Sequence, residues 1–380
     1  MNNHEPVATV EPQSNNRRLV LFPLPFQGHI NPMLQLANIL HTKGFKIIII
    51  HTDFNSPNQS NYPQFTFVSI SAGLSKSKDG SLNLDTSNYV INFLNKSCIE
   101  PFTVCMAKLL ELEPVTCLIS DAIWHFTQSV ADSLKLKRIV LRTSSMSCIP
   151  VYAAFVLGEK SYFKTTIKEE LELMTEKDIE EIHKDRSEKG NKELILYVSF
   201  GSIAQMSEAE FSDMAWGLAN SKQRFLWVVR PGSIYGSQWL ESLPKGFMEE
   251  VGERGRIVKW APQQEVLAHQ AIGCFWTHNG WNSTLESICE GVPMICSPCS
   301  YDQPINARYV TDVWKIGAML DEEMNWEQTG IAIKKVITGK EGSEMRQRSK
   351  SLQEKVNKSM QKGGSAYQSL ENLVDYILSI

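Results

Sequence analysis

Long apolar runs are absent from the sequence. None of its 380 residues lies in a stretch approaching the roughly 18 consecutive apolar residues that a membrane-spanning helix requires. The amino-terminal residues are mostly polar, whereas a secretory signal needs an apolar segment there. We therefore expect no membrane insertion and a cytoplasmic location.

An excess of positive charge is also absent. The chain has 38 Lys and Arg against 42 Asp and Glu, which gives a formal net charge of −4. Nucleic acids and anionic membranes attract basic surfaces, so neither is an expected partner. Hydrophobic residues make up 42% of the chain and charged residues 21%, which excludes a chain that is disordered as a whole. A single core rarely extends beyond about 250–300 residues, so the length favours two domains.

Metal-ligand and hydrolase motifs are likewise missing. Cys296 and Cys299 have a spacing that could suit zinc or redox chemistry, but no second Cys or His pair accompanies them. Several of the eight cysteines, such as Cys117, stand inside apolar runs, which is typical of core residues in a reducing compartment. No Gly-x-Ser-x-Gly motif occurs, so an α/β hydrolase is disfavoured.

The first half of the chain alternates strands and helices. Residues 18–23 and 45–51 are continuous, β-branched-rich apolar runs that predict buried parallel strands. Between them we predict a helix that begins with Asn31 as cap and Pro32 in the first turn, and ends at Gly44. Further strands are predicted at 115–120 and 138–142. This alternation is typical of a parallel sheet covered by helices.

The same pattern begins again at residue 194. Ser207 and Glu210 form a capping-box sequence that predicts the start of a helix. The expected fold class is therefore α/β, with two similar domains in tandem. The predicted strands of this half are 194–200, 225–229, 256–259, 273–277 and 293–297.

The two α/β regions are separated by a segment of different composition. In residues 159–193, 19 of 35 positions are charged, which favours a solvated helix and linker. The final segment carries an apolar helical stripe that must pack against another element. The predicted division is a disordered tail 1–16, a first domain 17–158, the linker 159–193, a second domain 194–364 and a closing helix 365–380.

Two polar residues follow predicted strands of the first domain. His29 lies in the loop after the first strand, and Asp121 follows the strand that ends at Ser120. Ligands of open α/β sheets bind at the carboxyl ends of strands, so the two side chains can meet there. A carboxylate on one imidazole nitrogen would make His29 a general base. The alternative, equally open from position alone, is that each residue merely caps a helix.

A second constellation lies at 275–286. A strand, a glycine turn and a helix start would present backbone N–H groups, with Ser283, Thr284 and His278, to an anion such as a diphosphate. In the alternative interpretation Ser283 and Glu286 are only a capping box, and Trp276 and Trp281 are core residues.

A resemblance bears on both alternatives. Residues 260–303, from Trp260 to Gln303, form a 44-residue block that closely resembles the signature box of plant UDP-dependent glycosyltransferases of secondary metabolism. Residues 22–32, 120–121, 198–202 and 227–231 are also similar to that family. The amino-acid sequence of these motifs most closely resembles the subgroup that contains the steviol glycoside glucosyltransferases.

The resemblance implies a fold and a reaction. The implied fold is two Rossmann-like domains facing across a cleft, the GT-B type. The implied activity is that of an inverting hexosyltransferase, which moves glucose from UDP-glucose to a hydroxyl of a small lipophilic metabolite, a terpenoid or flavonoid or its glycoside. The UDP-sugar and this acceptor are the expected partners. No metal or other cofactor is expected, because the chain also lacks an Asp-x-Asp motif.

The resemblance also implies residue roles. His29 would be the base and Asp121 its partner. The donor-binding set would divide into Trp260 and Gln263 for the base and ribose, Glu286 for the ribose hydroxyls, Ser202, His278, Asn282 and Ser283 for the diphosphate, and Trp281, Asp302 and Gln303 for the sugar, together with Gly280. The acceptor-binding set would be Phe26, Gly28, Thr143 and Ser144.

The chain departs from the family in its length. Relatives have a much longer segment between Thr143 and Val198, which carries part of the acceptor pocket. The usual Trp-Leu-Asp motif before Leu194 is missing as well. The rival hypothesis is therefore a weakly active or non-catalytic protein that still binds the UDP-sugar.

Overall fold

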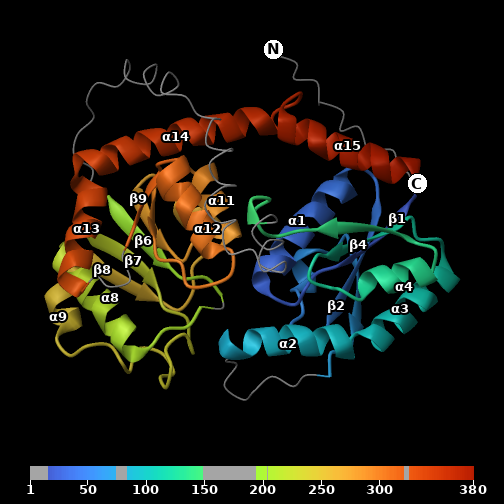
Figure 1. Ribbon diagram of the computed structural model, residues 1–380, viewed down its shortest axis with the longest axis horizontal. Coiled ribbons are helices and arrows are strands. Elements are labelled where there is room, and N and C mark those ends of the chain that lie inside the picture. Colours follow the sequence, from blue (N-terminus) through green and yellow to red (C-terminus); the bar gives the residue numbers. More distant parts are fainter. Residues whose placement is uncertain (1–15, 74–83, 149–193, 203, 321–324) are drawn as a thin grey trace, which may run out of the picture. The chain divides into compact units, whose positions relative to one another are not determined.

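The structure is a computed structural model that describes residues 16–73, 84–148, 194–202, 204–320 and 325–380, with 84–88 described as backbone only (Figure 1). These residues form two compact units. The first holds nearly all described residues up to Thr143, together with Ala366–Ile380, and the second holds the described part of Ser144–Ser365. The linker 159–193 and the tail, apart from Asn16, lie outside the described residues. The predicted domain boundaries stay predictions.

The first unit is built on a five-stranded sheet in which every pairing is parallel. The strand order is β3-β2-β1-β4-β5. In the central register Leu19 pairs with Ile47 on one side and with Cys117 on the other. The strands are β1 (Arg18–Phe22), β2 (Lys46–Thr52), β3 (Thr66–Ile70), β4 (Cys117–Asp121) and β5 (Lys137–Leu141).

Helices cover both faces of this sheet, because the buried strands are apolar on both sides. Leu19 and Leu21 pack with α1 (Gln27–Thr42) and with Val374 and Ile377 of α15 (Ser365–Ser379) on one face. On the other face Phe22 stacks on Phe102 of α3. Arg17 donates from Nη1 to the carbonyl oxygen of Ile377 at 2.9 Å, which fastens α15 to the start of β1. The remaining helices are η1 (Gln59–Asn61), α2 (Leu84–Ser97), α3 (Ile99–Leu112) and α4 (Thr127–Ser133).

The predicted start of α1 is wrong. The helix begins at Gln27, its N-cap is Phe26, and Pro32 lies inside it. The amides of His29 and Ile30 both bond to the carbonyl of Phe26 and so close the first turn ahead of the proline. Pro32 is the sixth residue of the helix, so its missing N–H and its ring affect only the bond to the carbonyl of Gly28 in the first turn, and the helix continues. The shift places His29 on the helix rather than in a loop.

The second unit is built on a six-stranded parallel sheet with the order β11-β10-β9-β6-β7-β8. Side chains alternate across it: Leu196 and Val198 belong to one apolar cluster and Tyr197 to the other. The strands are β6 (Ile195–Ser199), β7 (Arg224–Val228), β8 (Gly255–Val258), β9 (Ile272–Thr277), β10 (Met294–Cys296) and β11 (Gly317–Met319).

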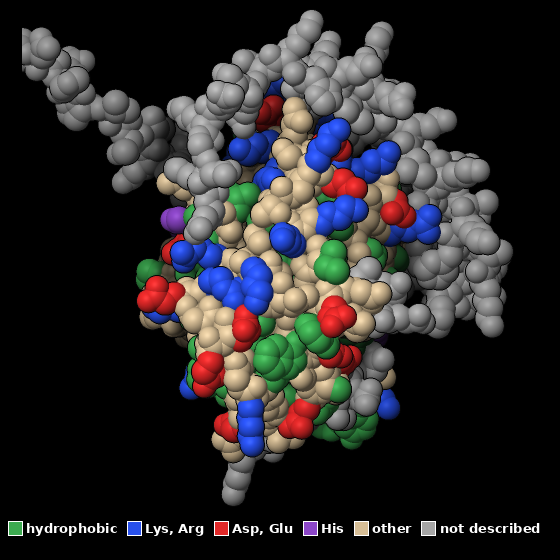
Figure 2. Space-filling model, turned by 90° about the vertical axis from the view of Figure 1, so that its left-hand side faces the viewer, with side chains coloured by type: hydrophobic (Ala, Val, Ile, Leu, Met, Phe, Trp, Pro, Cys, Tyr) green, Lys and Arg blue, Asp and Glu red, His purple; other side chains and the backbone are tan. Residues whose placement is uncertain are grey.

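The helices of the second unit follow the strands in turn. The capping box predicted at Ser207 and Glu210 is confirmed at the start of α8. Basic and acidic side chains are mixed on the face of this unit that Figure 2 shows. The helical elements are α8 (Glu208–Ser221), α9 (Phe247–Val251), η4 (Gly252–Arg254), α10 (Gln263–Ala268), α11 (Trp281–Cys289), α12 (Gln303–Arg308), η5 (Tyr309–Val313), α13 (Trp326–Thr338) and α14 (Lys340–Met360).

The α/β fold class is confirmed in both units. In each sheet the strand order reverses direction at one place, between β1 and β4 and between β6 and β9. Ligands of open α/β sheets bind in the crevice at such a switch point. Among the described residues no helix is long and apolar enough to cross a membrane, and no group of three acidic, His or Cys side chains is arranged to hold a metal ion.

Candidate functional site

His29 and Asp121 meet at the switch point of the first sheet. His29 Nδ1 lies 2.7 Å from Asp121 Oδ2. The Asp121 side chain is 1% exposed and that of His29 21%. The other carboxylate oxygen, Oδ1, accepts the backbone N–H of Ile123 at 2.9 Å. An imidazole that donates from Nδ1 to this carboxylate keeps the lone pair on Nε2, which is the arrangement that a general base needs.

The alternative of helix caps is wrong for both residues. The N-cap of α1 is Phe26 and that of α4 is Phe126, and neither helix has a side-chain cap. His29 is in the first turn of α1, and Asp121 is the last residue of β4. Their side chains are turned to each other instead of to backbone amides at helix ends.

A threonine supports the same imidazole. Thr143 Oγ1 lies 3.0 Å from His29 Nδ1, so this N–H faces two oxygens. Sequence reasoning assigned Thr143 to the acceptor, and its contact with His29 had no signal in the sequence. Phe26 is buried and packs edge-on to the His29 ring, with centroids 6.4 Å apart, while Gly28 and Ser144 are half-buried.

A second set of residues meets at the switch point of the second sheet. The His278 ring, which follows β9, lies between Gly201 after β6 and Gly280 at the start of α11. A Cβ on Gly201 would come within 2.6 Å of His278 Cε1, and one on Gly280 within 2.7 Å of Nε2. Only glycines leave room for this ring. Ser202, the predicted diphosphate ligand next to Gly201, is half-buried.

His278 is neutral at physiological pH. Burial of the ring, followed by the positive charge of Arg230, lowers the pKa of His278 to about 4. The side chain can therefore offer an N–H to an anion but brings no charge. This property makes the packed histidine a contributor to the pH dependence of stability.

We expect the free energy of unfolding to fall between pH 7 and pH 5, with about 2 kcal/mol of that fall due to His278. An unfolded histidine takes up a proton near its ordinary pKa of about 6.5, whereas the folded ring takes it up only near 4, so acid favours the unfolded state. Denaturant unfolding at both pH values measures the effect. His278→Gln should reduce the difference, and His269→Gln, at an exposed histidine of the same unit, should not. An unchanged difference in His278→Gln would contradict the assignment.

The start of α11 joins three predicted donor residues. Its N-cap is Gly280, without a side-chain cap, so the capping-box alternative for Ser283 and Glu286 is wrong. Instead Gln263 Nε2 donates to Ser283 Oγ at 2.9 Å and to Glu286 Oε2 at 2.6 Å. Gln264 Nε2 donates to the other oxygen of Glu286 at 3.0 Å.

The tryptophans near this helix differ in burial. Trp276 is 3% exposed and is a core residue, as that alternative predicted, but Trp281 is only half-buried. Asn282, in the first turn of α11, is half-buried too. Trp260 follows β8 and is 63% exposed, an unusual state for an indole. Its ring is open to a planar ligand.

Two of the three predicted sugar ligands, Asp302 and Gln303, lie at the start of α12. Gln303 Oε1 accepts the backbone amides of Cys299 and Ser300 at 2.8 and 2.9 Å. Asn306 Nδ2 donates to Asp302 Oδ2 and to the carbonyl of Asn279, each at 3.0 Å. The buried Asn306 therefore ties Asp302 to the loop that carries His278. Sequence reasoning missed Asn306, because this contact spans segments far apart in the chain.

Comparison with known proteins gives several matches. A family model described as UDP-glucoronosyl and UDP-glucosyl transferase matches residues 174–352. UDP-glycosyltransferase 76B1 of Arabidopsis thaliana is 40% identical, over 95% of this chain and 98% of that protein. UDP-glycosyltransferase 76G1 of Stevia rebaudiana is 42% identical, over 96% of this chain and 97% of that protein. The latter alignment spans 452 positions, more than the 380 residues present here, so the relative has segments that this chain lacks.

Solved structures share the fold. A UDP-glucosyltransferase from Polygonum tinctorium, capable of glucosylating indoxyl, superposes with a TM-score of 0.76 at 21% identity, covering 97% of this chain and 100% of that one. UGT2 of Phytolacca americana, complexed with UDP-2fluoro-glucose and pterostilbene, gives 0.75 at 21% identity, with 95% and 99% covered.

Proposed function

Because this chain belongs to the plant UDP-glycosyltransferase family, is a glycosyltransferase and has the GT-B fold of that family, we propose that it transfers glucose from UDP-glucose, with inversion, to a hydroxyl of a small lipophilic metabolite. The acceptor class we propose is a terpenoid, a flavonoid or a glycoside of one. The observation that carries the catalytic part is the 2.7 Å contact between His29 and the buried Asp121.

The donor-binding roles belong to the same proposal. Trp260, with its exposed indole, stacks on uracil, because an aromatic plane suits a nucleobase. Glu286 holds the ribose hydroxyls, since a carboxylate can accept two protons. Gln303 and Asp302 hold the sugar, and Gln303 supports glucose as that sugar.

The chemical step follows from these roles. The acceptor hydroxyl gives its proton to His29 Nε2 while its oxygen forms a bond to the anomeric carbon. The bond from that carbon to the diphosphate oxygen breaks, and UDP leaves with both electrons. Backbone N–H groups at the start of α11 and the neutral N–H of His278 stabilise the leaving charge. The step as we propose it uses no metal and no further cofactor.

Incubation with UDP-glucose and a panel of terpenoid and flavonoid aglycones and glycosides tests the proposal. We expect products heavier than their acceptors by one hexose, detected by mass spectrometry. The rival hypothesis, a non-catalytic UDP-sugar binder, is favoured by the segments that relatives have and this chain lacks. It would give measurable UDP binding without any glycoside product.

Trp260→Ala should weaken UDP binding about 5- to 150-fold, since base stacking on an aromatic side chain is worth about 1–3 kcal/mol. Isothermal titration calorimetry with UDP measures the loss. Trp326→Ala is the matched control, because that partly exposed tryptophan lies at the start of α13. UDP affinity that is equal in the two variants would remove the stacking role.

A further inference from the structure

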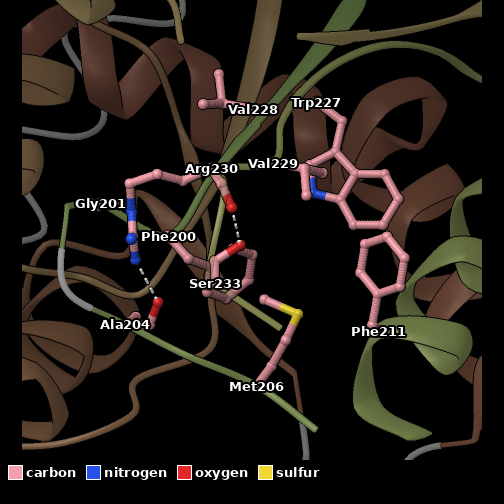
Figure 3. A pocket seen from close by; sticks show the side chains of 10 residues that line it. All are labelled: Phe200, Gly201, Ala204, Met206, Phe211, Trp227, Val228, Val229, Arg230 and Ser233. Atoms are coloured by element: carbon pink, nitrogen blue, oxygen red, sulfur yellow. Dashed lines mark hydrogen bonds between the residues drawn. The ribbon is translucent and has the colours of Figure 1, made fainter. Parts of the chain in front are cut away.

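A pocket borders the end of β6 in the second unit (Figure 3). Its walls are largely apolar side chains, and it has room for about one water molecule. Two polar side chains also line it, those of Arg230 and Ser233. Arg230 is the second residue after β7, which ends at Val228. It therefore lies at the carboxyl edge of the sheet, where the loops that carry the predicted diphosphate ligands begin.

Arg230 donates two hydrogen bonds to the backbone that follows β6. Its Nε donates to the carbonyl of Gly201 at 3.3 Å, and its Nη2 donates to the carbonyl of Ala204 at 2.7 Å, which Figure 3 shows as a dashed line. The backbone of Arg230 is itself fixed, because its carbonyl accepts the Ser233 hydroxyl at 2.6 Å. One guanidinium thus binds two backbone carbonyls, one on each side of Ser202 in the sequence.

The same guanidinium is a charge without a carboxylate partner among the described residues. Burial is the cause of the lowered pKa of Arg230, and no acidic side chain among the described residues raises that pKa again. Arginine remains protonated in proteins, so the group is a half-buried cation. Its charge is felt by His278, whose pKa it lowers. Two backbone carbonyls accept its N–H groups but leave its positive charge unneutralised, which suits an anionic ligand nearby.

We infer that Arg230 is a positioning residue for the donor diphosphate: it fixes the backbone at Gly201, next to the His278 ring, and supplies the positive charge that His278 lacks. This inference rests on the proposed function, because it takes a nucleoside diphosphate as the ligand. The neutral His278 and the N–H groups of α11 contact the anion. Arg230 acts by positioning these groups and by the electrostatic attraction of its positive charge.

Binding of uridine, UMP and UDP to Arg230→Met, measured by calorimetry, tests the inference. We expect uridine to bind as tightly as it does to the unmodified chain, and UDP to bind about tenfold more weakly, the size of a lost interaction with a charged group. Arg230→Lys keeps the positive charge but cannot make both hydrogen bonds of the guanidinium. Its UDP affinity should therefore lie between that of the unmodified chain and that of Arg230→Met. The KM for UDP-glucose should rise in the same order.

Arg346→Met is the matched control. Arg346 of α14 is a partly buried arginine that donates to the carbonyl of Val336 of α13 at 3.0 Å. The Arg346→Met variant should have the same affinities for uridine and UDP as the unmodified chain. If Arg230→Met weakens uridine and UDP by one common factor, or leaves UDP binding intact, the inference is overturned. If Arg230→Met does not fold, Arg230→Lys alone decides by the same comparison. If the unmodified chain binds none of the three nucleotides, the proposed function fails instead.

Discussion

Replacing His29 by alanine should lower the rate of glucosyl transfer about 10²–10⁴-fold, the contribution of a general base, while the dissociation constant of UDP stays unchanged. The acceptor hydroxyl would then have no group to take its proton as its oxygen attacks. Initial rates with UDP-glucose and an accepted aglycone, together with calorimetry for UDP, measure both quantities.

Two further variants make the His29 result specific. Asp121→Asn keeps the shape of the pair but removes the carboxylate that holds the proton on Nδ1, so it should also lower the rate without changing UDP affinity. His41→Ala changes a histidine in the last turn of the same helix and should have little effect. Full activity in His29→Ala would show that another group is the base.

Gly201→Ala should lower kcat/KM about 100-fold, since a misplacement of about 1 Å at a reacting centre has effects of that size. A Cβ at this position would come within 2.6 Å of His278 Cε1, so the ring or the loop must move. The backbone φ of +73° adds strain for any residue with a Cβ. Steady-state kinetics with UDP-glucose as the varied substrate measure the change.

Gly236→Ala separates strain from collision. Gly236 has a φ of +78°, and a Cβ there would meet nothing within 4 Å. This variant should lose about 1 kcal/mol of stability and keep its activity. Equal kcat/KM losses in the two variants would mean that the contact with His278 does not matter.

Sequence patterns that are local in the chain predicted much of the fold. Buried strands such as residues 45–51 are continuous apolar runs, and the structure has β2 at Lys46–Thr52. β3 was not predicted, because it is only partly buried and has no continuous apolar run, and β11 was missed because it has only three residues. The start of α1 was misplaced, since Pro32 and Asn31 resemble a helix start even inside a helix.

The candidate site shows the same division. His29 and Asp121 were paired from their places after two strands, because parallel sheets bring strand ends together. The contacts of Thr143 with His29, of Asn306 with Asp302 and of Arg230 with Gly201 were not foreseen. They depend on side-chain directions set by packing, which residue spacing does not encode.

The place of α15 has a consequence for synthesis on the ribosome. Val374 and Ile377 complete a core whose other buried side chains lie between Leu19 and Ile119, in the first third of the chain. The two large apolar clusters of the second unit, by contrast, draw their side chains from one continuous stretch, from Leu194 to Val356. The half of the protein that is translated first therefore waits longest for its last layer, and a nascent chain stalled before α15 lacks the two side chains that complete this core.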